Sequence, residues 1–163
     1  MQDNHSRKVL TAQQNFWLML MFALALIPNG TCAQTPGASS GSNAKPPVTK
    51  VDLEIAKRAR KILDSPAKWN RADNRKCPPE AKTFSLYCAL EMATVALSGK
   101  AEHRGAALQE ARFVIDEIAP NRNYEHRLMN YNNDPTTTFE DIQKVLRLVD
   151  ERLAKRLADP VRK

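Results

Sequence analysis

The residues best suited to chemistry lie in one short polar stretch, at His126, Tyr131, Asn133 and Asp134. An imidazole, a phenol, an amide and a carboxylate so close together could bind a ligand, and His126 with Asp134 could act as an acid–base pair. The other interpretation is turn chemistry, because Asn, Asp and Pro are the residue types that form turns before capped helices. Both interpretations stay open, and these four are the candidate ligand-binding residues.

The sequence contains none of the common catalytic motifs. Gly-x-Ser-x-Gly, His-Glu-x-x-His and a Gly-rich phosphate loop are all missing from it. Two Glu-His pairs end at His103 and His126, but adjacent residues on a helix do not face each other. No catalytic residue is therefore assigned, and a non-catalytic role is favoured.

Residues 1–33 have the order of a signal peptide: a start with two cations, an apolar run at 16–27, and small residues up to Ala33. The run is shorter than the roughly 20 residues that span a bilayer core, so a permanent anchor is the weaker alternative. Lipid attachment at Cys32 is another weak alternative. We expect cleavage before Gln34, a periplasmic or secreted protein, and membrane contact through the signal segment only.

Export would leave two cysteines, Cys77 and Cys88, in an oxidising compartment. A disulfide between them is the leading interpretation, and closing that loop is worth ~3 kcal/mol in the chain-entropy model. The alternative is a buried Cys88 and a free Cys77 thiol. A metal site is not expected, because these cysteines, His103 and His126 include no close pair such as Cys-x-x-Cys. No cofactor is predicted.

Residues 34–50 are rich in Pro, Gly, Ser and Asn and are predicted to be a disordered linker. Without residues 1–33 the chain loses two cations and one anion, which leaves a net charge of +6. The cations are spread over every predicted helix instead of forming a stripe, so no nucleic-acid partner is expected. The partner expected instead is an unknown envelope protein or an anionic envelope component.

The stretch 84–97 is apolar on almost every side and predicts a buried central helix. Helices with one apolar face are predicted to pack around it, at 51–63, 104–119 and 139–157. Thr138 and Asp141 form a capping box that starts the last of these. The predicted fold class is therefore all-α, a small bundle of about four helices in a domain of residues 51–159.

Two short motifs are shared with a known family: the Cys-Ala-Leu segment at 88–90, and the Asn-Asn-Asp turn at 132–134 before the Thr138 cap. Through them the chain resembles an uncharacterised bacterial family of small helical domains. The family pattern has Trp where this chain has Asn132. The resemblance covers about residues 53–157 and implies a fold, but no activity is established for the family.

The function expected from the sequence is an exported, non-catalytic helical binding or interaction module. Its partner would lie in a groove between the Asn-rich stretch and the helices. The alternative is a small periplasmic hydrolase or ligand-binding enzyme centred on His126 and Asp134.

Overall fold

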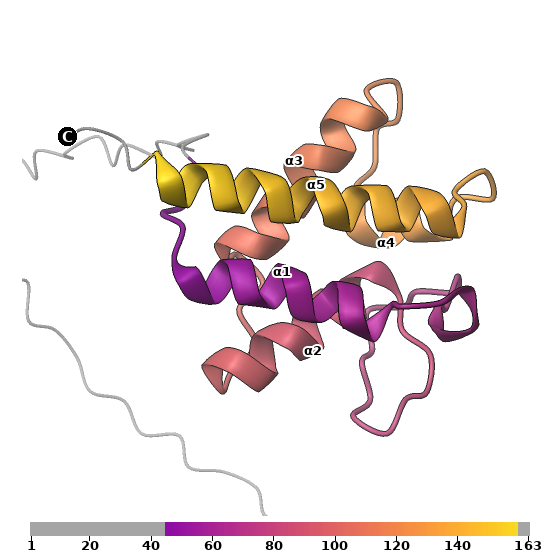
Figure 1. The fold of residues 1–163 in the computed structure, drawn as a ribbon. Coiled ribbons are helices and arrows are strands. Elements are labelled where there is room, and N and C mark those ends of the chain that lie inside the picture. Colours follow the sequence, from indigo (N-terminus) through magenta and orange to yellow (C-terminus); the bar gives the residue numbers. More distant parts are fainter. Residues whose placement is uncertain (1–44, 160–163) are drawn as a thin grey trace, which may run out of the picture. The chain divides into compact units, whose positions relative to one another are not determined.

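The computed structural model describes residues 45–159, and the predicted signal peptide and residues 34–44 of the predicted linker lie outside this range. The described part is all-α, which confirms the predicted fold class (Figure 1). Its elements are α1 (Lys50–Ile62), the short 3-10 helix η1 (Pro66–Lys68), α2 (Leu86–Ser98), α3 (Ala106–Ile118), α4 (Arg127–Asn133) and α5 (Phe139–Ala158). Not one of these helices has both the length and the apolar character needed to cross a membrane.

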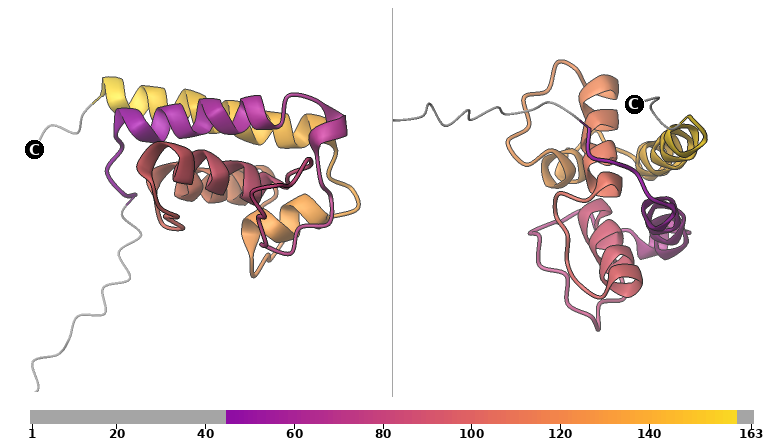
Figure 2. Two further views of the ribbon diagram at one scale, coloured as in Figure 1. Left: turned by 90° about the horizontal axis from the view of Figure 1, so that it is seen from below. Right: turned by 90° about the vertical axis from the view of Figure 1, so that its left-hand side faces the viewer.

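The helices form two layers, with α1 beside α5 on one side and α2 and α3 on the other (Figure 2). α1 packs against both α2 and α5, and α3 packs against α5 and α4. Alanines allow α1 and α2 to approach each other closely, since Ala59 of α1 and Ala93 of α2 are completely buried. The core between the layers is filled by aliphatic side chains such as Leu90, Val114 and Leu146.

Helix starts follow the local sequence signals. The predicted capping box of α5 is present: the Thr138 side chain accepts a bond from the Asp141 N–H, and the Asp141 carboxylate accepts one from the Thr138 N–H. Thr49 and Asp52 form the same arrangement at the start of α1. α2 begins after Ser85, whose side chain also caps its helix. These caps satisfy backbone donors that a helix leaves without partners.

The central helix is buried over its first two-thirds only. From Leu86 to Leu90 every residue of α2 is buried, but Val95 is 43% exposed and Leu97 is 40% exposed. The apolar composition of this stretch predicted burial along its whole length. Burial also requires a neighbouring element, and the last turn of α2 is only partly covered by one.

One helix, α4, was not predicted, because Asn is a poor helix former and the stretch 121–135 indicated a loop. Tertiary hydrogen bonds outweigh that local preference. Asn132 is completely buried; its side-chain oxygen accepts bonds from Trp69 Nε1 at 2.9 Å and from the Leu86 N–H at 3.0 Å. Its amide donates to the Asn70 carbonyl at 2.9 Å. This asparagine therefore joins α4 to α2 and to the segment after η1.

The disulfide between Cys77 and Cys88 is present, as predicted, with 5.2 Å between the Cα atoms. It ties the loop before α2 to the first turn of that helix. Disulfides are typical of proteins that fold outside the reducing cytoplasm.

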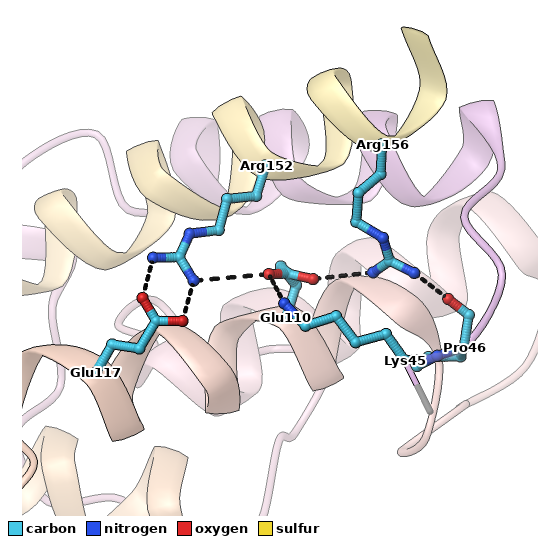
Figure 3. Close-up of polar contacts among 6 residues, drawn as sticks. All are labelled: Lys45, Pro46, Glu110, Glu117, Arg152 and Arg156. Carbon is cyan, nitrogen blue, oxygen red and sulfur yellow. Dashed lines mark hydrogen bonds and ion pairs between the residues drawn. The ribbon is translucent and has the colours of Figure 1, made fainter. Parts of the chain in front are cut away.

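The first described residues pack onto α3 and α5 through a buried carboxylate (Figure 3). Glu110 of α3 has no exposed surface and lies 3.2 Å from Lys45 Nζ and 2.9 Å from Arg156 Nη1. A third cation, Arg152, lies at 3.8 Å, and Arg156 also donates to the Pro46 carbonyl. We call this the Glu110 cluster. The cluster includes Lys45 and Pro46, which belong to the predicted linker, so these two residues contact the helices.

Candidate functional site

A pocket of about 480 Å³ opens where the loop before α2 approaches the starts of α2 and α4 and the side of α3. We call it the basic pocket, since three arginines and two histidines line it beside a single acid. Its lining residues are Asn74, Arg75, Tyr87, His103, Arg112, Glu125, His126, Arg127, Leu128 and Met129. Pockets that bind small ligands are of this size.

Arg112 is the half-buried cation of the basic pocket. Its Nη1 donates to the His103 carbonyl and to the Gln109 side-chain oxygen, both at 2.8 Å. Both acceptors are neutral, and within residues 45–159 no carboxylate pairs with this guanidinium. Burial lowers the pKa of Arg112, and the positive charges of Arg127 and Arg104 lower it further. An anion placed here would relieve an uncompensated charge.

Arg75 reaches the pocket from a loop that is held at several points. Its φ of 60° is unusual for a residue with a side chain, and its N–H donates to Asp73 Oδ1 at 2.7 Å. Asn133 bonds both backbone groups of Asp73, at 2.7 and 2.8 Å. Two residues further on, Cys77 is joined to Cys88. Strained backbone of this kind persists where surrounding contacts fix it. The hydrogen bonds to Asp73 and the disulfide therefore hold the backbone of Arg75 in place.

Tyr87 and His103 form one wall of the basic pocket. The Tyr87 hydroxyl lies 2.9 Å from His103 Nδ1, and the two rings are stacked with 6.1 Å between their centroids. Glu91 Oε2 lies 3.6 Å from the same nitrogen. Burial raises the pKa of Tyr87, and the Glu91 carboxylate adds to this effect. The phenol is therefore protonated at neutral pH and can donate a hydrogen bond.

Arg127 and His126, which also line the pocket, have acids nearby. Arg127 Nε lies 2.8 Å from Asp116 Oδ1, and His126 Nε2 lies 3.8 Å from Glu125 Oε1. All of these side chains are at least partly exposed, so the pairs are weak. Of the three arginines that line the pocket, Arg75 and Arg112 form no ion pair within residues 45–159, and Arg112 is the one of these two that is half-buried.

The four candidate residues from the sequence do not line one common pocket. His126 lies in the basic pocket, whereas Tyr131 lines a separate pocket of about 320 Å³ beside α5. Asn133 uses its side chain to hold Asp73, as described above. Asp134 is also turned toward its own chain, where it forms the cluster described next.

Asp134 accepts hydrogen bonds from several donors at the end of α4. The Thr136 hydroxyl and N–H lie 2.7 and 2.9 Å from Oδ1, and the Tyr124 hydroxyl lies 2.8 Å from Oδ2. Arg122 also pairs with Oδ2. These bonds, those from Thr136 most strongly, hold the pKa of Asp134 far below its usual range. The carboxylate is fixed by the fold and stays ionised.

Sequence reasoning did not identify Arg75, Tyr87, Arg112 or Arg127. They come from four different elements and have no short spacing that a motif could describe. Arginine is also a common residue of exposed helix faces, so composition alone gives no signal. Only the fold shows that these side chains share one pocket and that the half-buried Arg112 has no counter-charge within the described residues.

Comparison with protein families finds one match: the model of a family described as a family of unknown function (DUF6197) matches residues 47–152. Comparisons with curated proteins and with solved structures found no match. The family description gives no activity.

Proposed function

The chain belongs to the family of unknown function DUF6197, and we propose that it is an exported, non-catalytic module that binds an anionic group in the basic pocket. The observation that carries this proposal is Arg112, which is half-buried, lies among other cations and contacts only neutral acceptors. A partly desolvated charge without a partner raises the energy of the free protein. Binding an anion lowers that energy, so the pocket favours negatively charged ligands.

The chemistry of the lining narrows the ligand to a carboxylate or phosphate group on a small molecule or on an envelope component. Arg75 and Arg112 can each donate two parallel hydrogen bonds to such a group. Leu128 and Met129 offer apolar contact to the rest of the ligand. A few placed polar groups beside apolar side chains are typical of small-molecule sites.

Export is the second part of the proposal. The Cys77–Cys88 disulfide supports folding in an oxidising compartment, and the order of residues 1–33 is that of a signal peptide. The protein would then be periplasmic or secreted. N-terminal sequencing of the exported protein is expected to begin at Gln34, whereas an intact Met1 in the membrane fraction would contradict this.

The hydrolase alternative receives less support. An acid–base pair of His126 and Asp134 needs both groups at one substrate. The two residues line no common pocket, and Asp134 is occupied by Thr136, Tyr124 and Arg122. Binding without catalysis fits the arrangement better.

Calorimetric titration with phosphate, glycerol 1-phosphate and succinate at low ionic strength tests the proposal, because salt screens exposed charges. The wild-type protein is expected to bind at least one of these anions. Replacing Arg112 with Gln should weaken binding about tenfold or more, since a charge-assisted hydrogen bond is worth about 1.5–3 kcal/mol.

Arg147→Gln is the matched control, because Arg147 is exposed on the outer face of α5 and its loss removes the same charge. This variant should bind like the wild type. Equal weakening by both substitutions would show only a general charge effect, and binding of none of the three anions would contradict the proposal directly.

A further inference from the structure

One acid beside the basic pocket has a buried oxygen without a partner. Glu91 lies on α2, and its Oε2 accepts no hydrogen bond within residues 45–159. The His103 imidazole is close to it, with 3.6 Å between Nδ1 and Oε2. A buried carboxylate oxygen without a donor costs free energy. A proton on His103 Nδ1 would supply Glu91 with both a donor and a counter-charge.

Tyr87 fixes the orientation of the His103 ring. Its hydroxyl lies 2.9 Å from Nδ1, and the planes of the two rings differ by 14°. Because burial raises the pKa of Tyr87, the hydroxyl keeps its proton and donates to Nδ1 when the histidine is neutral. The hydrogen of the neutral ring is then on Nε2. Nε2 has no partner within the described residues and the side chain is 60% exposed, so this N–H is available to a ligand.

His103 belongs to the same pocket as Arg112, and the two residues are joined. Arg112 Nη1 donates to the His103 carbonyl at 2.8 Å, and both side chains line the basic pocket. The second histidine of the pocket, His126, is held less firmly. Its Nε2 lies 3.8 Å from Glu125, whose side chain is 87% exposed, and its ring makes no hydrogen bond within residues 45–159. His103 is therefore the histidine whose ring is positioned by the fold.

Charged groups from several elements act on His103 in opposite directions. Acids favour its protonated form, and cations oppose it. The acids are Glu91 of α2, Glu102 beside it in the chain and Glu125 before α4; the cations are Arg75, Arg104, Arg112, His126 and Arg127. An anion in the pocket offsets the cations, so anion binding favours uptake of a proton by His103. By linkage, that proton strengthens anion binding by the same factor.

We propose that His103 is a ligand-binding residue of the basic pocket and that it makes anion binding stronger at acid pH. Nε2–H donates to the bound anion, while Glu91 and Tyr87 act as positioning residues at Nδ1. When His103 takes up a proton from solvent, Nδ1–H gives Glu91 Oε2 the donor that it lacks, and the bond from Nε2 to the anion becomes charge-assisted. This inference rests on the proposed function, since His103 has no anion to contact in an empty pocket.

Calorimetric titration with phosphate at about pH 8 and about pH 5.5 tests the proposal, because histidine changes its charge between these values. The measured quantity is the affinity of the wild type divided by that of His103→Gln. Phosphate itself gains a proton over this range, but it does so with both proteins, so the effect cancels in the ratio. We expect the ratio to increase about fivefold from the higher to the lower pH, since a charge-assisted hydrogen bond replaces a neutral one.

Two further variants separate His103 from its surroundings. His126→Gln is the matched control, because it removes the other histidine of the same pocket, and its affinity ratio to the wild type should be the same at both pH values. Glu91→Gln removes the carboxylate that favours the protonated ring. This variant should bind phosphate at the higher pH no more weakly than the wild type, but it should lose most of the increase at the lower pH. A merely structural role of Glu91 would weaken binding equally at both.

Three results would overturn the inference. If phosphate binds but the ratio for His103→Gln does not change with pH, His103 does not bind the anion, and the proposed function is unaffected. An equal change in the ratio for His126→Gln would show only a general effect of histidine charge. Absence of phosphate binding at both pH values would refute the inference, and the proposed function would fail with it only if glycerol 1-phosphate and succinate also do not bind.

Discussion

Two charged residues on α3, Glu110 and Arg112, are treated in opposite ways by the fold. They lie two positions apart, so their side chains leave the helix in different directions. Glu110 is buried and lies beside Lys45, Arg152 and Arg156 (Figure 3). Arg112 contacts two neutral oxygens. The Glu110 carboxylate is paired with cations of the protein itself. The Arg112 guanidinium has no such counter-charge and can pair with an anionic ligand.

The contrast gives a physical criterion for separating scaffold from site. A buried charge with several partners stabilises one arrangement of the chain, and removing it leaves those partners uncompensated. A half-buried charge with no counter-charge contributes little to the fold and marks a candidate binding site. Asp134 falls in the first class by this criterion, although the sequence suggested a ligand-binding role.

The largest effect on stability is expected from Glu110→Ala. Three cations would lose their common partner and the start of the domain would detach, so the free energy of unfolding should fall by about 4 kcal/mol. Glu117→Ala is the control, because Glu117 also pairs with Arg152 but is 56% exposed, and its loss should cost less than about 1 kcal/mol. Urea denaturation measures both. Equal losses would mean that burial of Glu110 gives it no special role.

The disulfide should have the next largest effect. The double variant Cys77→Ser and Cys88→Ser is expected to lose about 3 kcal/mol of stability, because the loop is no longer restrained in the unfolded chain. It should also weaken anion binding, since Arg75 lies two residues from Cys77 and the pocket loop would gain freedom. Thermal melting and calorimetric titration give the two numbers. Unchanged anion affinity would show that the Asn133 contacts alone position Arg75.

A smaller effect is expected from Asp134, whose contribution to stability is present at neutral pH and is lost in acid. Its pKa in the folded protein lies below the value of about 3.9 in the unfolded chain. Its stabilisation is therefore complete above that pH and is lost as the pH falls toward the folded pKa. Asp134→Asn should lower stability by about 2 kcal/mol at pH 7 and flatten the acid side of the stability curve. The exposed Asp159→Asn is the control, and an acid limb unchanged by Asp134→Asn would refute the assignment.

Most of the fold could be predicted from the sequence because its signals are local. Apolar spacing placed α1, α3 and α5, the Thr138–Asp141 box fixed the start of α5, and the cysteine pair gave the disulfide. α4 was missed because Asn132 is held by tertiary hydrogen bonds that no local pattern reports.

The site could be predicted only in part. His126 lies in the basic pocket, but the sequence placed it in a group with Asp134, which the fold uses elsewhere. Arg112 has ordinary neighbours in the sequence, and its importance lies in what surrounds it in space. Whether a charge is balanced depends on side chains from other helices, so no window of sequence could have separated Arg112 from Glu110.

The smallest effect on stability is expected at Arg112. Its loss removes two hydrogen bonds to neutral oxygens but also relieves repulsion from Arg127 and Arg104. The free energy of unfolding of Arg112→Gln should therefore lie within about 0.5 kcal/mol of the wild-type value. Addition of phosphate should raise the melting temperature of the wild type and not that of the variant, because only the folded wild type binds the anion. Thermal melting with and without phosphate measures both effects. A loss as large as that of Glu110→Ala would place Arg112 with the scaffold, and the difference between the two residues of α3 would no longer mark a site.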